Sequence, residues 1–225
     1  NLETTMPAVL TYTEGTLLLD GLSPKEIGGL FAEGLWKWDA RVGQFRADAF
    51  RYGEVAGILR ETLGSTFSDH VATPVEIRWP KVNLHKPRRD QAEAMDAWLS
   101  SGGRGLVVMP TGSGKTEVAL HLMARLGIST LVVAPVRDLM YQWHSRIREG
   151  LGVETGIIGD RLHKPSAVTV TTYDSAAIHM SSIGERFGLL IFDEAHHLAG
   201  GYYRDAAIMS AATLRLGLTA TPERS

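Results

Sequence analysis

The residues best suited to chemistry form a glycine-rich loop, Met109-Pro-Thr-Gly-Ser-Gly-Lys115-Thr116, between an apolar run and a helix-like stretch. Gly112 and Gly114 let the backbone curl so that successive N–H groups point at a phosphate group. Lys115 then reaches the outer phosphates, and the hydroxyl of Thr116 is placed to bind Mg²⁺. We therefore predict that the phosphates of Mg-ATP bind to Thr111, Gly112, Ser113, Gly114, Lys115 and Thr116.

Two acidic residues, Asp193 and Glu194, follow a second apolar run, Leu189–Phe192. A carboxylate in that position can hold Mg²⁺ opposite Thr116, usually through water. The carboxylate beside it can orient and deprotonate an attacking water, as a general base must. We predict Lys115, Asp193 and Glu194 as catalytic residues, with Thr116 and Asp193 as the Mg²⁺ ligands. A solvated acidic turn is the alternative interpretation, and the presence of a phosphate loop in the same chain makes it the weaker one.

Two histidines, His196 and His197, directly follow the acidic pair and Ala195. His163 and His179 lie within a few tens of residues, but at no recognised metal-ligand spacing. The chain has no cysteine, which excludes disulfides and thiolate metal sites. We therefore predict that His196 couples the nucleotide to a neighbouring loop instead of binding a metal.

The elements that must position these residues begin near Lys81, where short apolar runs alternate with helix-like stretches. Continuous apolar strands that alternate with helices predict an α/β fold with a parallel sheet covered on both faces. Ligands of such sheets bind at the carboxyl ends of the strands, where these motifs lie. The predicted strands are Leu106–Met109, Thr130–Ala134, Val168–Thr172, Leu189–Phe192 and Leu216–Leu218.

Residues 1–80 show a different pattern and predict a small α+β domain that precedes residues 81–225. Alternating runs broken by turn residues predict two hairpins, and a periodic apolar stretch ending at a glycine predicts a helix. The hairpins are Val9–Thr13 with Thr16–Asp20, and Trp36–Asp39 with Gln44–Arg46; the helix is Arg51–Leu63, and Val75–Trp79 is expected to be a closing strand.

Trp36 and Trp38 lie in the second predicted hairpin, near Arg41 and Arg46. Aromatic and basic side chains together can stack on and attract a single strand of nucleic acid. Large aromatic side chains are more often buried than exposed, so the favoured interpretation places both tryptophans in a hairpin core.

Composition leaves the function open. The net charge of −2 over 225 residues neither indicates nor excludes nucleic-acid binding. The longest apolar runs are too short to span a bilayer, and the first residues lack the features of a signal peptide. We therefore expect no membrane association and a cytoplasmic location.

Together, the two chemical motifs resemble those of the superfamily 2 helicases, and further segments occur in that family's order. Arg88-x-x-Gln91 looks like its adenine-reading element, although Asp90 stands where the family often has an aromatic residue. Ala134–Trp143, Thr171–Ser175 and Thr219–Thr221 look like its motifs Ia, Ib and III. The resemblance implies that Arg88 and Gln91 bind the nucleotide, and that DNA contact or coupling involves Pro135, Arg137, Thr172, Tyr173, His196, Thr219 and Thr221.

Longer segments are similar to the XPB family of DNA repair helicases. These segments are Thr169–Ala176, Leu189–His197 and Arg215–Arg224. Leu10–Asp20 and Trp38–Tyr52 resemble the damage-recognition domain of archaeal and bacterial members. The resemblance implies a RecA-like first helicase domain over 81–225, after a damage-recognition domain over 1–80. The family's Arg-Glu-Asp motif is altered or missing at Glu223-Arg224-Ser225.

The resemblance also implies a function, namely an ATP-dependent DNA helicase or translocase in DNA repair of the nucleotide-excision type. Its partners would be DNA and a nuclease, as in prokaryotic relatives, and we expect a monomer in a prokaryotic cytosol. We expect the chain to be the ATP-binding N-terminal half, without the second RecA-like domain and therefore nearly inactive alone. An RNA helicase, the motor subunit of a restriction system and a non-catalytic DNA-recognition module remain alternatives.

Overall fold

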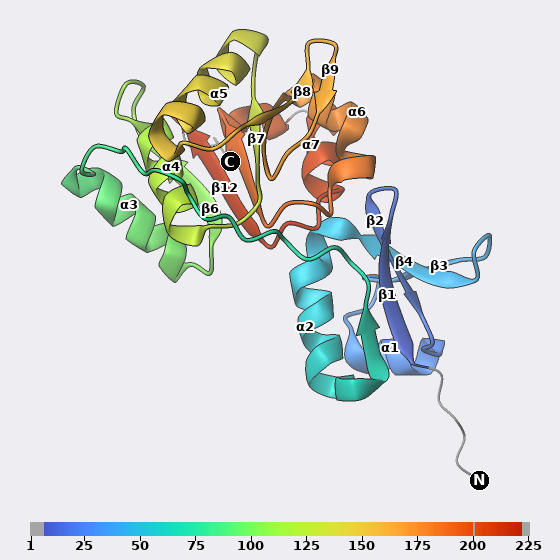
Figure 1. Ribbon diagram of the computed structural model, residues 1–225. Coiled ribbons are helices and arrows are strands. Elements are labelled where there is room, and N and C mark those ends of the chain that lie inside the picture. The colour runs from blue at the N-terminus through green and yellow to red at the C-terminus, as the bar shows by residue number, and fades with distance from the viewer. Residues whose placement is uncertain (1–6, 200, 222–225) are drawn as a thin grey trace.

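The first of two β-sheets is built from the N-terminal part of the chain. A computed structural model describes residues 7–199 and 201–221 (Figure 1). The first sheet has the strand order β3-β4-β2-β1-β5, and the helices α1 (Pro24–Leu30) and α2 (Tyr52–Leu63) contribute to its core. Its strands are β1 (Ala8–Thr13), β2 (Thr16–Asp20), β3 (Lys37–Asp39), β4 (Gln44–Asp48) and β5 (Phe67–Asp69).

Both predicted hairpins and the predicted helix of this part are confirmed. β1 and β2 pair antiparallel around Glu14 and Gly15, which have φ values of 48° and 83°. Positive φ at both central residues matches the twist of a tight hairpin. β3 pairs antiparallel with β4, and α2 ends at Gly64, where the backbone has a φ of 52°.

The prediction of a closing strand at Val75–Trp79 is wrong. The fifth strand of the first sheet is β5, which runs parallel to β1. The segment 75–79 instead lies against the end of α4: Ile77 N–H donates to the Gly127 carbonyl at 2.7 Å, and the indole of Trp79 donates to the Ala124 carbonyl at 3.0 Å. Its apolar alternation therefore reports burial against the second core, and the division at residue 80 stays a prediction.

The second sheet has the strand order β6-β12-β11-β7-β10-β8-β9. Its first six members are parallel, and β9 is antiparallel to β8. The predicted α/β class is confirmed, whereas the β8–β9 hairpin was not anticipated. The strands are β6 (Arg104–Val108), β7 (Thr130–Ala134), β8 (Gly156–Gly159), β9 (Leu162–Lys164), β10 (Val168–Thr172), β11 (Leu189–Asp193) and β12 (Leu214–Thr219).

Helices cover both faces of this sheet, because alternate residues of each strand point to opposite sides. On one face, Val132 and Ile191 pack with side chains of α3 (Arg89–Ser100), α4 (Lys115–Leu126) and α5 (Arg137–Leu151). On the other face, the residues adjacent to Val132 and Ile191 on the same strands pack with side chains of α6 (Tyr173–Ile183) and α7 (Gly201–Ile208). None of the helices in the described part of the chain is long and apolar enough to cross a membrane.

The two sheets are joined through the β1–β2 hairpin. The hydroxyl of Tyr12 lies 2.9 Å from the Met180 carbonyl and 2.8 Å from the Met209 carbonyl, at the ends of α6 and α7. Gly184 permits this approach, because a Cβ atom there would collide with the Tyr12 hydroxyl and both carbonyls. Burial raises the pKa of Tyr12, which keeps the phenol a hydrogen-bond donor.

We expect Tyr12→Phe to lower the free energy of unfolding by about 1–3 kcal/mol, because it removes the hydroxyl donor from the Met209 carbonyl, whereas the Met180 carbonyl keeps the N–H of Gly184. Chemical denaturation followed by circular dichroism measures this change. Tyr202→Phe is the control, since the Tyr202 side chain is exposed. Equal stability of the two variants would contradict a structural role for the Tyr12 hydroxyl.

Candidate functional site

The glycine-rich loop connects the end of β6 to the start of α4. Gly112 and Gly114 have φ values of 75° and 82°, a backbone region that favours glycine. Lys115, the first residue of α4, is almost fully buried, and its Nζ lies 3.2 Å from the Met109 carbonyl at the start of the loop. The loop therefore curls around a buried ammonium group, as a phosphate-binding loop requires.

The strand order brings the other predicted motifs to this loop. β12 lies between β6 and β11, and the N–H of Met109 donates to the carbonyl of Thr219 at 3.0 Å. Asp193 ends β11 opposite Leu218 of β12. A cavity of about 500 Å³ at this edge is lined by Lys115, Thr116, Trp143, Arg146, Asp193 and Glu194. The predicted catalytic residues, far apart in sequence, thus face one hollow.

Asp193 is held by two aromatic side chains that the sequence did not single out for it. The indole N–H of Trp143, on α5, donates to Asp193 Oδ2 at 2.8 Å, and the hydroxyl of Tyr173 donates to the Asp193 carbonyl at 3.0 Å. Burial raises the pKa of Asp193, the Trp143 hydrogen bond opposes this shift, and the nearby Glu194 carboxylate adds to it.

The donor set suits a hard divalent cation. A desolvated carboxylate next to a second carboxylate favours a positive charge between them. Carboxylate and hydroxyl oxygens, which Asp193 and Thr116 supply, are the ligands that Mg²⁺ prefers. Both residues line the same cavity.

His196 lies between the acidic pair and the end of β12. Its Nδ1 is 3.5 Å from Glu194 Oε2 and 3.4 Å from Thr219 Oγ1. The Thr219 hydroxyl in turn donates to the Thr221 carbonyl at 3.0 Å. Glu194 has a φ of 48°, an uncommon value for a residue with a side chain. Coupling between the acidic pair and motif III requires contacts of this kind, from Glu194 through His196 to Thr219. The coupling itself stays a prediction.

Gln91 and Arg88 are directed at the phosphate loop. The Gln91 side chain is buried; its Nε2 donates to the carbonyls of Ser113 at 3.2 Å and Gly114 at 3.3 Å, and its Oε1 accepts from the N–H of Arg88 at 2.9 Å. The guanidinium of Arg88 also donates to the Ser113 carbonyl and pairs with Asp90. In this structure both residues brace the loop, and their contact with adenine stays a prediction.

A second hollow of about 460 Å³ adjoins the first on the side of Arg88 and Gln91. The two cavities share Glu117 and Arg146, which form an ion pair between α4 and α5. A larger hollow of about 720 Å³, at the far end of α5, contains none of the predicted site residues. The second hollow therefore offers room for a nucleotide base beside the phosphate cavity.

The predicted DNA-contacting residues divide into exposed and buried ones. Pro135 and Arg137 follow β7, and Thr172 ends β10 beside Ala134 of β7, so these residues share one edge of the sheet. Arg137 is exposed, whereas Tyr173 is only 2% exposed. Tyr173 is therefore not a surface for DNA: its ring packs on Phe192, which leaves coupling through Asp193 as its possible role.

The two tryptophans of the first sheet differ, so the prediction that both are core residues is wrong for one of them. Trp36 is buried, but Trp38 is 58% exposed, with its ring against the edge of Phe45 at the end of the sheet. Trp38 lies on β3, one of the two edge strands of the first sheet.

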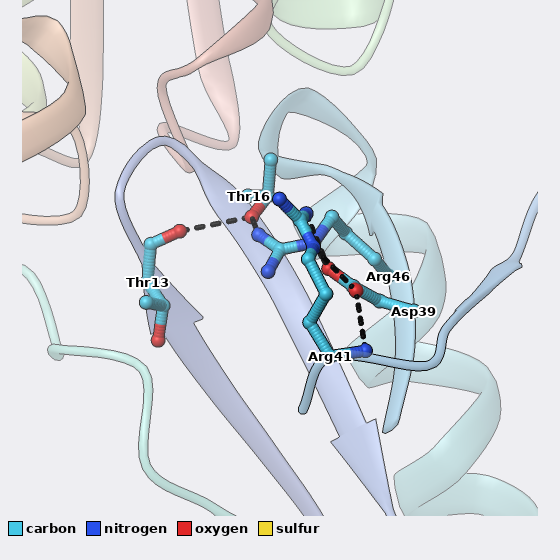
Figure 2. A network of polar contacts seen from close by, with 5 residues as sticks. All are labelled: Thr13, Thr16, Asp39, Arg41 and Arg46. Carbon is cyan, nitrogen blue, oxygen red and sulfur yellow. Dashed lines mark hydrogen bonds and ion pairs between the residues drawn. The ribbon is translucent and has the colours of Figure 1, made fainter. Parts of the chain in front are cut away.

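Arg41 and Arg46 are not free charges. Figure 2 shows both guanidinium groups directed at the Asp39 carboxylate, with N–O distances of 2.8 Å and 3.0 Å. The Arg41 guanidinium is the main reason that the pKa of Asp39 lies well below its usual range. Arg46 also donates to the hydroxyl of Thr16, which donates to the Thr13 carbonyl. The trio carries one net positive charge.

The altered Arg-Glu-Asp motif expected at 223–225 lies outside the described residues.

Two family models match the chain. Residues 84–224 match the model described as type III restriction enzyme, res subunit, and residues 10–71 match the xeroderma pigmentosum group B helicase damage recognition domain.

Curated relatives give a consistent picture. The DNA 3'-5' translocase XPB2 of Sulfurisphaera tokodaii is 39% identical over 96% of this chain and 46% of its own length. A putative DNA 3'-5' helicase Rad25 of Haloarcula marismortui is 34% identical over 64% of this chain and 24% of its own length. The chain thus spans less than half the length of these relatives.

Solved structures show the fold. The UvsW helicase from bacteriophage T4 superposes with a TM-score of 0.54 at 16% identity, covering 96% of this chain and 93% of that structure. The Sulfolobus solfataricus SWI2/SNF2 ATPase core in complex with dsDNA has a TM-score of 0.51 at 17% identity, covering 68% of this chain and 34% of that structure. The second sheet therefore has the architecture of RecA-like helicase cores.

Proposed function

We propose that this chain binds Mg-ATP and couples its hydrolysis to movement on DNA. The chain belongs to the XPB family of superfamily 2 helicases, and its residues 84–224 match the res subunit of type III restriction enzymes. One observation carries the proposal: Lys115, Thr116, Asp193 and Glu194 line a single cavity at the carboxyl edge of a parallel sheet. That arrangement supplies a phosphate-binding cation, oxygen ligands for Mg²⁺ and a carboxylate base.

Each of these side chains has a distinct role in the proposed reaction. The N–H groups of the glycine-rich loop and the ammonium of Lys115 hold the phosphates and offset their charge. Thr116 and Asp193 would hold Mg²⁺, which neutralises charge on the phosphate oxygens when bound. Glu194 orients a water molecule and accepts its proton as the water attacks the terminal phosphate, whose bond to the bridging oxygen breaks so that ADP leaves.

Motif contacts support coupling to DNA. His196 touches both Glu194 and Thr219, and Tyr173, at the start of α6, touches the backbone of Asp193. Arg137 follows β7, which pairs with the strand β11 that carries Asp193, and Thr172 ends β10, one strand further along the same sheet. These contacts support the proposed coupling between the two places.

The match of residues 10–71 to a damage-recognition domain supports DNA, and a repair role, over RNA. Within that domain, the exposed Trp38 is the side chain best placed to stack on an unpaired base. The nuclease partner, the monomeric state and the cytoplasmic location stay predictions.

The first test is single-turnover ATP hydrolysis by an excess of the chain, with duplex DNA, single-stranded DNA or RNA added. We expect slow, Mg²⁺-dependent hydrolysis that DNA accelerates and RNA does not, because the damage-recognition domain and the motor then act on one substrate. Equal or greater acceleration by RNA would move the proposal to the RNA helicases. Mg²⁺-dependent hydrolysis that neither polymer changes would favour a DNA-recognition module with an uncoupled ATP site.

A further inference from the structure

The turn between β8 and β9 places a carboxylate on the predicted DNA-contacting edge. Asp160 and Arg161 form this turn, with φ values of 49° and 62°. Asp160 Oδ1 accepts from the guanidinium of Arg137 at 3.1 Å, and its Oδ2 accepts from the hydroxyl of Tyr141 at 2.9 Å. Both oxygens of one carboxylate are therefore bound by the first turns of α5.

The two donors are suited to a phosphate group. Arg137 and Tyr141 are four residues apart on α5, so their side chains project from the same face of the helix. Guanidinium groups and hydroxyls are frequent donors to nucleic-acid phosphates. Arg137 itself is exposed, with 63% of its side chain accessible, so a phosphate can reach it. The Asp160 carboxylate thus binds where a phosphate oxygen would be expected.

The hairpin is also packed directly against the next predicted DNA-contacting segment. A Cβ atom on Gly159, which precedes the turn, would lie 2.9 Å from the Ser175 hydroxyl. Ser175 donates its N–H to Thr172, the capping residue of α6, at 3.3 Å. The turn therefore lies between the start of α5 and the start of α6, on the surface that the proposed function assigns to DNA.

The hydrogen bonds from Tyr141 and Arg137 lower the pKa of Asp160, so the carboxylate is ionised at neutral pH. An ionised carboxylate beside Arg137 neutralises its charge and repels an approaching phosphate. Because Asp160 accepts from both Arg137 and Tyr141, a phosphate that binds both donors must displace the Asp160 carboxylate.

We infer that Asp160 is an internal competitor for the DNA phosphate that Arg137 binds, and that DNA displaces the β8–β9 turn when it occupies this edge. The inference rests on the proposed DNA-binding function and adds a regulatory element to it. The contribution of Arg137 to DNA affinity then depends on how much more strongly it binds a phosphate than it binds Asp160.

The test is the affinity of the chain for a fluorescent DNA duplex, measured by anisotropy at fixed salt. We expect Asp160→Asn to tighten binding by about two- to fivefold, the range that corresponds to an exposed ion pair. Asp96→Asn is the matched control, because Asp96 forms an exposed ion pair with Arg125 on α3 and α4.

Three further results decide the matter. Arg137→Ala should weaken DNA binding, and Asp160→Asn should have no effect in the Arg137→Ala background. Hydrogen exchange of residues 157–164 should rise when DNA is added. The inference is overturned if Asp160→Asn weakens binding or leaves it unchanged while Arg137→Ala weakens it, or if Asp96→Asn tightens binding equally. Failure of the chain to bind DNA, or an unchanged affinity in Arg137→Ala, instead overturns the proposed DNA contact itself and the inference with it.

Discussion

Replacing Glu194 with glutamine is expected to lower the rate of ATP hydrolysis by about 10²–10⁴-fold, the usual contribution of a general base. The amide has nearly the same shape as the carboxylate but cannot accept the proton of the attacking water. Glu194 lines the phosphate cavity and reaches His196 at 3.5 Å, so the substituted side chain retains its position. Nucleotide affinity should change little, because the phosphates are held by the loop and Lys115.

Single-turnover quench measurements give the hydrolysis rate, and titration with a fluorescent ATP analogue gives the affinity. Glu93→Gln is the control: Glu93 pairs with Arg89 on the surface of α3, and its replacement removes the same charge from a side chain that lines neither cavity. Hydrolysis by Glu194→Gln within a few-fold of the unaltered chain would mean that another group takes the proton.

Replacing Trp143 with phenylalanine is expected to lower Mg²⁺-dependent nucleotide binding or hydrolysis by about 10–100-fold, the usual effect of losing an outer partner of a metal ligand. The phenyl ring fills most of the same space but has no N–H group. Asp193 Oδ2 then loses its 2.8 Å hydrogen bond, so the carboxylate is no longer held in one orientation. Trp143 is thus a positioning residue, acting through Asp193.

Trp98→Phe provides a closely matched control. Trp98 is 3% exposed and its indole donates to the Arg215 carbonyl at 3.1 Å, away from the phosphate cavity. Both variants should lose similar stability, about 1–3 kcal/mol for an unpaired acceptor. Trp143→Phe alone should shift the Mg²⁺ concentration needed for half-maximal binding of the ATP analogue. A similar shift in Trp98→Phe would show that lost stability, rather than lost positioning, explains the effect.

The second sheet was predictable because short runs rich in apolar or β-branched residues alternate with helix-like stretches, even though Leu106 and Val108 of β6 are exposed. The β8–β9 hairpin was not, since its first strand offers only Ile157 and Ile158 between two glycines. Val75–Trp79 has the alternation of a strand, yet its hydrogen-bond partners lie at the end of α4 and just before β7. Alternation reports that one side of a segment is buried and does not report which core buries it.

The site, too, has parts that local sequence predicts and parts that it does not. The glycine-rich loop and the acidic pair are contiguous in sequence, so their residue types identify them directly. Their supporting contacts join distant residues: Trp143 meets Asp193 across 50 positions, and Gln91 meets Ser113 across 22. No local pattern distinguishes an indole that binds a carboxylate from one that fills a core. The same limit applies to Trp36 and Trp38, which are neighbours in sequence and differ in exposure.

The strand order also determines when the phosphate loop is completed during synthesis on the ribosome. Among the described strands, β6 pairs only with β12, which is the last strand of the second sheet to be made and lies between β6 and β11. Until Leu214–Thr219 leaves the exit tunnel, the nascent loop has no strand beside it, and the N–H of Met109 lacks its carbonyl partner. Pairing between segments so distant in sequence is slow and exposes the chain to misassembly. The nascent polypeptide is therefore expected to gain its affinity for nucleotide late, after the other described strands of this sheet have been made.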